Sequence, residues 1–394
     1  MIKLFEAFSG YGSQSMALRD ANIPFEVVGI SEIDKYAIVA YEAVHGKIKN
    51  FGDISKIDEK QLPDFNLFTY SFPCTDISIS GKQKGINEGT RSGLLWECER
   101  IIEHKKPQFL LMENVKNLIG KKFKPDFDRW CKILESMGYV NHWQVLNAKE
   151  HGIPQNRERV FMISILNGDD YKFPEKEELK IFLKDILEDE VDEKYYLKPE
   201  QYSNLLKNLK ETGKLNTNPS GKGMNGNIST NNISPTLTTN KGEGLKIVVG
   251  AAQRGRENGQ ELELNKSDCL NTITTVQKDS LVAEFNIIQK ARGFNMGGIK
   301  DMCPPITASS WQENNYLLEG LRVRKLTPLE CFRLMNVKDE DFYKIQKALN
   351  DTFYKGKDRS SSQLYKLAGN SIVVKPLMKI FKNLYNETKK NCSL

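Results

Sequence analysis

The sequence predicts an α/β fold with a doubly wound, mixed but mostly parallel sheet, together with a smaller β-rich domain. Two observations lead to this prediction. Short apolar runs alternate with helical patterns over roughly the first 185 residues, and such alternation is typical of a parallel sheet covered by helices on both faces. Between about residues 217 and 315 the chain becomes rich in Asn, Gly, Thr and Ser, which favours short strands and turns.

The expected elements follow one another in the order that such a sheet requires. Strands are predicted at residues 2–7, 25–30, 66–71, 108–112 and 160–165, and helices at about 15–20, 34–44, 94–103 and 127–137. Helical patterns return after about residue 321, and the segment 364–384 is expected to fold back onto the first domain. Ligands of doubly wound sheets bind beyond the carboxyl ends of the strands, so functional residues are expected in the loops that follow them.

A degenerate repeat marks the middle of the chain. The segment S-P-T-L-T-T at Ser234–Thr239 resembles L-N-T-I-T-T at Leu270–Thr275 and P-P-I-T at Pro304–Thr307. The central apolar residue recurs at spacings of 36 and 33 residues. We interpret the three copies as β-hairpin units with loops on one face. A low-complexity linker is the alternative.

Composition excludes several classes of protein. The seven cysteines form no C-x-x-C pair and their number is odd, which argues against a disulfide framework, and the four histidines show no metal-binding spacing. No apolar run approaches the roughly 18 residues of a membrane span, and the N-terminus lacks the pattern of a secretory signal. We therefore expect a cytoplasmic protein without a metal. The net charge of +6 indicates only a mild preference for polyanions.

A Gly-rich turn, F-S-G-Y-G-S-Q, follows the first expected strand and opens a helix at Phe8–Gln14. Glycines in such a turn let the backbone approach a nucleoside. Glu32 lies 22 residues beyond Gly10, at the end of the second strand, where an acidic residue bonds ribose hydroxyls. Asp53 follows the next short segment, and it either contacts the adenine end of a nucleoside or is a turn residue.

Three further segments place reactive side chains near strand ends. Cys74 follows the proline that ends a buried strand and opens a Gly-punctuated polar loop. A free cysteine is more often a small buried hydrophobe than a nucleophile, but the polar and basic neighbours weaken that alternative here. Glu113 is expected at the carboxyl end of a neighbouring strand, where a buried carboxylate needs a partner. Arg157 and Arg159 are two residues apart at the start of a strand and are expected on one face of it. A salt-bridged surface strand is the alternative for this pair.

Six blocks in order resemble those of the DNA (cytosine-5)-methyltransferases of bacterial restriction–modification systems and phages. They are F-S-G-Y-G, F-P-C, E-N-V, Q-N-R-E-R, R-K-L-T-P-L-E-C-F-R-L-M at Arg324–Met335 and L-A-G-N-S-I-V at Leu367–Val373. They extend over nearly the whole chain outside residues 186–320. Thr75 departs from the pattern, since the family usually has Gln or Asn after the Pro-Cys pair. This difference puts the local loop geometry in doubt, but not the class.

The resemblance implies a Rossmann-like fold and methyl transfer from S-adenosylmethionine to C5 of cytosine. Cys74 would add to C6 of the base as a thiolate, which makes C5 nucleophilic. Glu113 would keep N3 protonated, while Arg159 would bind the O2 carbonyl with support from Arg157. Water is expected to remove the C5 proton before Cys74 leaves. The implied cofactor-binding residues are Phe8, Gly10, Tyr11, Gly12, Glu32, Ile33, Asp53, Ile54, Phe72, Pro73, Asn370 and Ser371.

The implied partner is double-stranded DNA, from which the target cytosine must be flipped out. The loop Ser78–Gly85 is expected to close over the base, and the middle segment to read base edges in the major groove. The residues expected to contact DNA are Ser78, Ser80, Lys82, Gln83, Arg254, Arg256 and Arg292.

The expected organisation is a catalytic S-adenosylmethionine-binding domain (1–185), a target-recognition domain (186–320) and a return segment that completes the catalytic domain (321–394). We expect a monomer that needs no membrane. The sequence leaves open whether a cognate restriction endonuclease acts beside it. Two alternatives remain. A tRNA cytosine-5 methyltransferase would have a shorter recognition region, and the intact Cys74, Glu113 and Arg159 argue against a catalytically silent DNA-binding regulator.

Overall fold

The computed structural model describes residues 1–73, 92–168, 170–181, 183–195 and 322–391, together with the strand segments 252–254, 261–263, 286–289, 298–300 and 315–319. The chain divides into two compact units. The larger is built mainly from Met1–Phe182 and Pro328–Leu394, and the smaller from Leu183–Pro304 and Gln312–Thr327.

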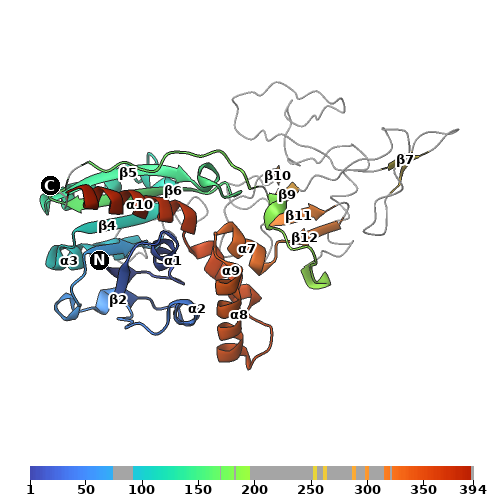
Figure 1. Ribbon diagram of the computed structural model, residues 1–394, viewed down its shortest axis with the longest axis horizontal. Helices are drawn as coiled ribbons and strands as arrows, with labels where there is room; N and C mark the ends of the chain where they lie inside the picture. Colours follow the sequence, from blue (N-terminus) through green and yellow to red (C-terminus); the bar gives the residue numbers. More distant parts are fainter. Residues whose placement is uncertain are drawn as a thin grey trace, which may run out of the picture. The chain divides into compact units, whose positions relative to one another are not determined.

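The larger unit is organised around a six-stranded sheet with the strand order β2-β1-β3-β4-β6-β5 (Figure 1). The first four strands in this order run parallel, β6 is antiparallel to β4, and β5 is antiparallel to β6. The prediction of a doubly wound, mostly parallel sheet is therefore confirmed. The strands are β1 (Ile2–Ala7), β2 (Phe25–Ser31), β3 (Leu67–Tyr70), β4 (Phe109–Val115), β5 (Tyr139–Asn147) and β6 (Glu158–Leu166).

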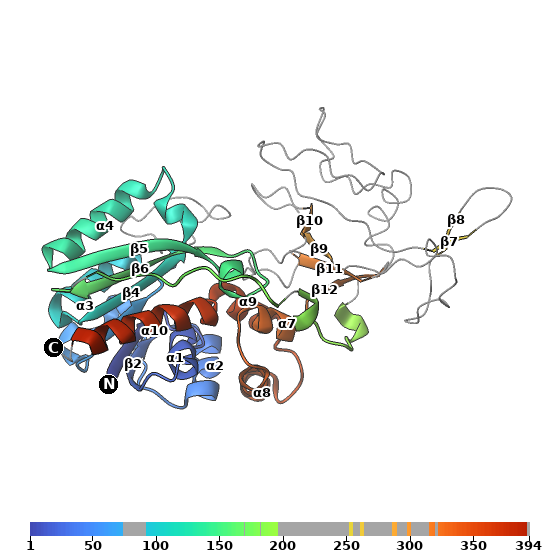
Figure 2. The ribbon, with the colours of Figure 1, turned by 45° about the horizontal axis from the view of Figure 1, so that its top comes forward.

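Helices cover this sheet, and the last helix of the chain packs beside the first (Figures 1 and 2). The hydroxyl of Tyr171 donates a hydrogen bond of 3.1 Å to the carbonyl of Ile380 in this last helix. The helices are α1 (Ser13–Asp20), α2 (Lys35–His45), α3 (Leu95–Lys105), α4 (Lys124–Ser136), α7 (Pro328–Leu334), α8 (Asp339–Tyr354), α9 (Ser361–Asn370) and α10 (Val374–Asn391). No described helix combines the length and apolar character that crossing a bilayer requires.

Alternation along the strands separates two faces of the sheet. Phe68 and Tyr70 of β3 pack in the core cluster with Trp130 of α4, whose indole N–H donates to the Tyr70 hydroxyl at 3.2 Å. On the opposite face Glu6 of β1 is fully buried and accepts hydrogen bonds from Ser15 of α1 and Tyr41 of α2. The sheet is thus buried on both sides, which explains why its strands are short continuous apolar runs.

Two details differ from the sequence expectations. Strand β4 continues to Val115, so Glu113 lies inside the strand and not at its end. Strand β5 was not predicted, because it forms an edge of the sheet and exposes Val140 and Trp143, which weakens its apolar pattern.

The smaller unit contains a four-stranded antiparallel sheet and a two-stranded hairpin among the described residues. The sheet has the order β10-β9-β11-β12, formed by β9 (Asn286–Gln289), β10 (Gly298–Lys300), β11 (Asn315–Glu319) and β12 (Arg322–Lys325). The hairpin joins β7 (Ala252–Arg254) and β8 (Glu261–Glu263). The expected β-rich character of the middle segment is therefore present, whereas the three predicted repeat copies, Ser234–Thr239, Leu270–Thr275 and Pro304–Thr307, lie outside the described residues.

Candidate active site

The site lies where the strand order reverses. Strand β1 has β2 on one side and β3 on the other, so the loops that follow β1 and β3 leave the sheet in different directions. A cavity of about 590 Å³ opens there, within the size range of small-molecule sites. The residues of this cavity that the sequence singled out are Phe8, Gly10, Glu32, Ile33, Asp53, Ile54, Phe72, Pro73, Glu113, Arg157, Arg159, Asn370 and Ser371.

The Gly-rich turn forms the floor of the cavity in an unusual backbone conformation. Phe8, Gly10 and Gly12 all have positive φ angles, of 56°, 57° and 82°. A Cβ added to Gly12 would clash with the imidazole of His45 and would lie only 2.8 Å from the Tyr41 ring, so a larger residue at this position requires these side chains to move. Tyr11 is fully buried and stacks on Phe332 at 5.3 Å. Tyr11 and Gly12 therefore shape the turn from behind and do not line the cavity.

Glu32 links the Gly-rich turn to the segment that follows β2. Its Oε2 accepts a hydrogen bond of 2.9 Å from the backbone N–H of Gly10, and its Oε1 accepts from the N–H groups of Ile33 and Asp34 at 2.8 and 2.9 Å. Asn50 fixes the Glu32 backbone from the other side, since its Oδ1 accepts from the Glu32 N–H and its Nδ2 donates to the Glu32 carbonyl. The carboxylate thus joins the ends of β1 and β2 and still faces the cavity.

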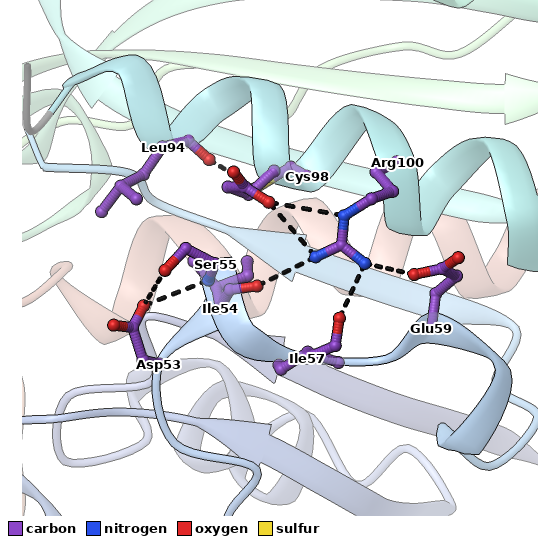
Figure 3. A network of polar contacts seen from close by, with 9 residues as sticks. Asp53, Ile54, Ser55, Ile57, Glu59, Leu94, Cys98 and Arg100 are labelled. Carbon is purple, nitrogen blue, oxygen red and sulfur yellow. Dashed lines mark hydrogen bonds and ion pairs between the residues drawn. The ribbon is translucent and has the colours of Figure 1, made fainter. Parts of the chain in front are cut away.

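Asp53 caps the short helix Ile54–Lys56, as Figure 3 shows. Its Oδ1 accepts from the backbone N–H and the hydroxyl of Ser55, at 3.1 and 2.8 Å. These hydrogen bonds lower the pKa of Asp53. Arg100 of α3 donates to the carbonyls of Ile54 and Ile57, at 3.2 and 2.7 Å, and thereby holds this segment against the domain. Asp53 is a turn residue that also borders the cavity.

Glu113 and Arg159 form a buried pair on adjacent strands. Arg159 Nε lies 3.2 Å from Glu113 Oε1, but the geometry is not that of a hydrogen bond, and this oxygen has no hydrogen-bond partner in the described part of the chain. Burial raises the pKa of Glu113, and the guanidinium groups of Arg159 and Arg157 oppose this effect. Glu113 therefore holds a proton more readily than an exposed glutamate and keeps one oxygen available to a ligand.

Asn114 connects this strand with the loop that follows β3. Its side-chain amide donates to the carbonyl of Phe72 at 3.0 Å. The hydroxyl of the buried Ser92 donates to the carbonyl of Pro73 at 2.7 Å. Two hydrogen bonds therefore fix the backbone up to the residue before Cys74. Cys74 and Thr75 lie outside the described residues, as do Ser78, Ser80, Lys82 and Gln83.

Arg157 has a different position from Arg159. It precedes β6, is almost fully buried, and donates from Nη2 to the carbonyls of Gly369 and Ser371 at 3.2 and 2.6 Å. The Ser371 hydroxyl also pairs with Ser13 at the start of α1, at 2.7 Å. Arg157 thus holds the G-N-S turn of the C-terminal segment against the first domain. Asn370, between the two bonded residues, is exposed and lines the cavity.

Some site residues were missed by the sequence reasoning. Asn114, Asp34 and Lys366 all line the cavity. Asn114 belongs to the E-N-V block, which could have drawn attention to it, whereas Asp34 and Lys366 are 332 residues apart and only the fold brings them together. Of the other predicted DNA contacts, Arg254 ends β7, and Arg256 and Arg292 lie outside the described residues. No group of metal-ligating side chains occurs in the parts of the chain that the structure describes.

Comparison with known proteins gives consistent matches over nearly the full length. The family model described as C-5 cytosine-specific DNA methylase matches residues 2–386. The type II methyltransferase M2.ScrFI of Lactococcus lactis subsp. cremoris is 35% identical, with 98% of this chain and 99% of that protein covered. The orphan methyltransferase M.SPRI of Bacillus phage SPR is 36% identical, with 97% of each covered.

Solved structures match the fold at lower identity. The Dnmt2 methyltransferase of S. pombe matches with a TM-score of 0.59 and 18% identity, over 98% of this chain and 99% of that one. A putative DNA modification methyltransferase from an E. coli prophage matches with a TM-score of 0.55 and 15% identity, over 99% and 100% of the two chains.

Proposed function

Because the chain belongs to the C-5 cytosine-specific DNA methylase family, we propose that it transfers a methyl group from S-adenosylmethionine to a cytosine flipped out of double-stranded DNA, through a covalent bond between Cys74 and C6. The observation that carries this proposal is the buried Glu113–Arg159 pair, which shares one cavity with the Gly-rich turn and with Pro73, the residue before Cys74.

The residues at the cavity fit the proposed cofactor. The turn at Gly10 leaves space on its open side, since a Cβ added there would meet only the Ser371 hydroxyl, at 3.9 Å. Glu32 supplies a carboxylate of the kind that binds ribose hydroxyls in nucleotide-binding sheets, and Phe8, Ile33 and Ile54 supply apolar surface for a base. When bound, S-adenosylmethionine supplies an electrophilic methyl group on a sulfonium.

The protein's own groups would then act on the cytosine ring. The Cys74 thiolate attacks C6, and the electron pair displaced from the C5–C6 bond is delocalised toward N3. Glu113, whose pKa is raised by burial, donates a proton at N3, so that negative charge does not accumulate on the ring. Arg159 donates to the O2 carbonyl. C5 then takes the methyl group, a water molecule removes the C5 proton, Cys74 leaves as a thiolate as the C5–C6 double bond re-forms, and the N3 proton returns to Glu113.

We also propose that the substrate is double-stranded DNA and that the protein recognises a specific base sequence in it. Flipping the base costs a few kcal/mol, which contacts with the surrounding duplex must supply. We assign target recognition to the smaller unit, whose short antiparallel strands offer loops for this purpose. The lactococcal relative is named a type II methyltransferase and the phage relative an orphan methyltransferase, which supports a bacterial restriction–modification or phage setting. We propose that the enzyme acts there as a monomer.

A covalent trapping experiment tests the proposal. Double-stranded DNA containing 5-fluorocytosine should form a denaturation-resistant adduct with the protein in the presence of S-adenosylmethionine, because fluorine at C5 blocks the final elimination. Cys74→Ser should abolish both the adduct and methylation of ordinary DNA while leaving DNA binding largely intact. Methylation of tRNA but not of DNA, or methylation by the Ser variant, would refute the proposal.

A further inference from the structure

We propose that Lys366 and Asp34 are positioning residues that set the width of the cofactor cavity, an inference that rests on the function proposed above. Lys366 Nζ lies 2.7 Å from Asp34 Oδ2. The two residues line the same cavity. Asp34 belongs to a lining segment, residues 31–34, that connects β2 to α2, and Lys366 belongs to a second lining segment formed by residues 366, 367 and 369–372.

Each partner stands next to a residue that the cofactor would contact. Lys366 lies four residues before Asn370 in α9, which is about one helical turn. Asp34 lies two residues after Glu32, and its backbone N–H donates to the Glu32 carboxylate at 2.9 Å. The ion pair therefore ties the segment that carries Asn370 to the segment that carries Glu32.

Asp34 has two separable roles. Its Oδ1 caps α2 by accepting from the N–H of Tyr36 at 3.0 Å, whereas its Oδ2 receives Lys366. Asparagine is as good a helix cap as aspartate, so Asp34→Asn removes the ion pair without removing the cap. The side chains of Asp34 and Lys366 are 25% and 43% exposed. This partial exposure limits the expected effect on binding to about fivefold.

S-adenosylmethionine and S-adenosylhomocysteine differ in charge, and this difference separates a positioning role of the ion pair from a direct electrostatic effect on the ligand. S-adenosylmethionine carries a positive sulfonium that its product S-adenosylhomocysteine lacks. Lys366→Met makes the cavity more negative, and Asp34→Asn makes it more positive. If the pair acts through charge, the two variants shift the preference between these ligands in opposite directions. If it positions the walls, both variants weaken both ligands alike.

Isothermal titration calorimetry with each ligand, on the full chain without DNA, measures this directly. We expect Kd to rise about fivefold for both ligands in Lys366→Met and in Asp34→Asn, no further rise in the double variant, and recovery of most of the affinity in Lys366→Arg. Lys347→Met serves as a matched control, because it removes a comparable pair of 2.6 Å with Asp351 on α8 and should leave both Kd values unchanged.

Two results would overturn the inference: wild-type affinity in folded Lys366→Met, or opposite shifts of ligand preference in the two single variants. Loss of folding, checked by circular dichroism, would be separated from loss of positioning by Lys366→Arg, which keeps the ion pair. Failure of the wild-type protein to bind either ligand would instead refute the proposed function itself.

Discussion

Asn114 holds the backbone carbonyl of Phe72 through a 3.0 Å hydrogen bond, across a sequence separation of 42 residues. The bond fixes the loop two residues before the proposed nucleophile. We expect Asn114→Ala to reduce methyl transfer by about 100-fold, since misplacing a reacting group by an ångström has this order of effect. The unfolding free energy should fall by only about 1–2 kcal/mol.

Single-turnover methylation and chemical denaturation measure these two effects. Asn141→Ala provides a matched control, because its amide also donates to a backbone carbonyl, that of Cys131, at 3.0 Å but away from the cavity. A rate for Asn114→Ala equal to that of the control would show that the bond is merely structural.

Glu113→Gln tests the proton donor. The neutral amide has the same shape but no acidic proton, so we expect the methylation rate to fall by a factor of about 100 to 10,000. Because burial raises the pKa of Glu113, the acid form persists to higher pH than in an exposed glutamate. The wild-type rate should therefore decline as pH rises through this pKa, while the rate of the variant should lack that decline.

The pH–rate profile measures both expectations, with Glu158→Gln as the control. Glu158 lies on β6, where it forms an exposed ion pair with Lys116 at 2.9 Å. An unchanged rate in Glu113→Gln would remove Glu113 from the mechanism.

Gly12→Ala should distort the Gly-rich turn and thereby prevent cofactor binding. Gly12 has φ of +82°, and an added Cβ would lie 2.8 Å from the Tyr41 ring. Gly46 also has φ of +82° with no neighbour within 4 Å, but its ψ of 178° lies in a region essentially restricted to glycine, whereas Gly12, with ψ of 44°, is in the left-handed helical region. We expect Gly46→Ala to cost about 1–3 kcal/mol from backbone strain alone and to bind cofactor normally.

Gly12→Ala should cost about 1–3 kcal/mol from overpacking and should lose cofactor binding. Calorimetry with S-adenosylhomocysteine compares the two variants, and thermal unfolding checks that both are folded. Equal cofactor affinity in the two would contradict the steric explanation.

Glu6 should make stability depend on pH. Burial raises its pKa from 4.5 to about 7. The folded protein then binds more protons than the unfolded chain between these values, so this residue destabilises the fold progressively as pH rises from about 4.5 to 7. Glu6→Gln removes that titration, and its stability relative to the wild type should increase over this window by up to about 3 kcal/mol.

Denaturant unfolding at pH 5, 6, 7 and 8 measures the trend, and Glu26→Gln, an exposed change on β2, should show none. A stability difference between Glu6→Gln and wild type that does not change with pH would contradict the prediction.

Arg157→Lys should loosen the C-terminal turn. Lysine keeps the charge, but its side chain is shorter, so its ammonium does not reach the position of Nη2, the nitrogen that donates to the carbonyls of both Gly369 and Ser371. We expect the unfolding free energy to fall by about 2 kcal/mol and S-adenosylhomocysteine to bind at least several-fold more weakly. Isothermal titration calorimetry measures this affinity. A wild-type Kd in Arg157→Lys would show that other contacts hold the C-terminal turn.

Local patterns were sufficient for every strand of the large sheet except β5 and for much of the cavity. The Gly-rich turn and Glu32 were predictable because a short strand, a turn and an acidic residue at a set spacing have the same geometry in most nucleotide-binding sheets. The order of six motif blocks was sufficient for the family, which the comparison with known proteins confirmed.

Long-range side-chain bonds were not predictable. Arg157 and Arg159 looked equivalent two residues apart, yet β6 begins at Glu158, and the two guanidinium groups have different partners. Arg157 bonds residues more than 200 positions away, and nothing in its own neighbourhood indicates this. The same holds for Asp34 and Lys366. The predicted roles of Cys74 and of the DNA-contacting residues stay predictions.

The cavity is lined both by residues from the beginning of the chain and by residues between 366 and 372, and this has a consequence for biosynthesis. A ribosome releases the first set long before the second, so we expect the nascent protein to bind cofactor only after residues 366–372 have also emerged. Methylation would thereby be confined to chains in which both segments have been synthesised. The same arrangement suggests that two fragments, separated within the middle segment, would each be inactive and would regain activity only by reassociating.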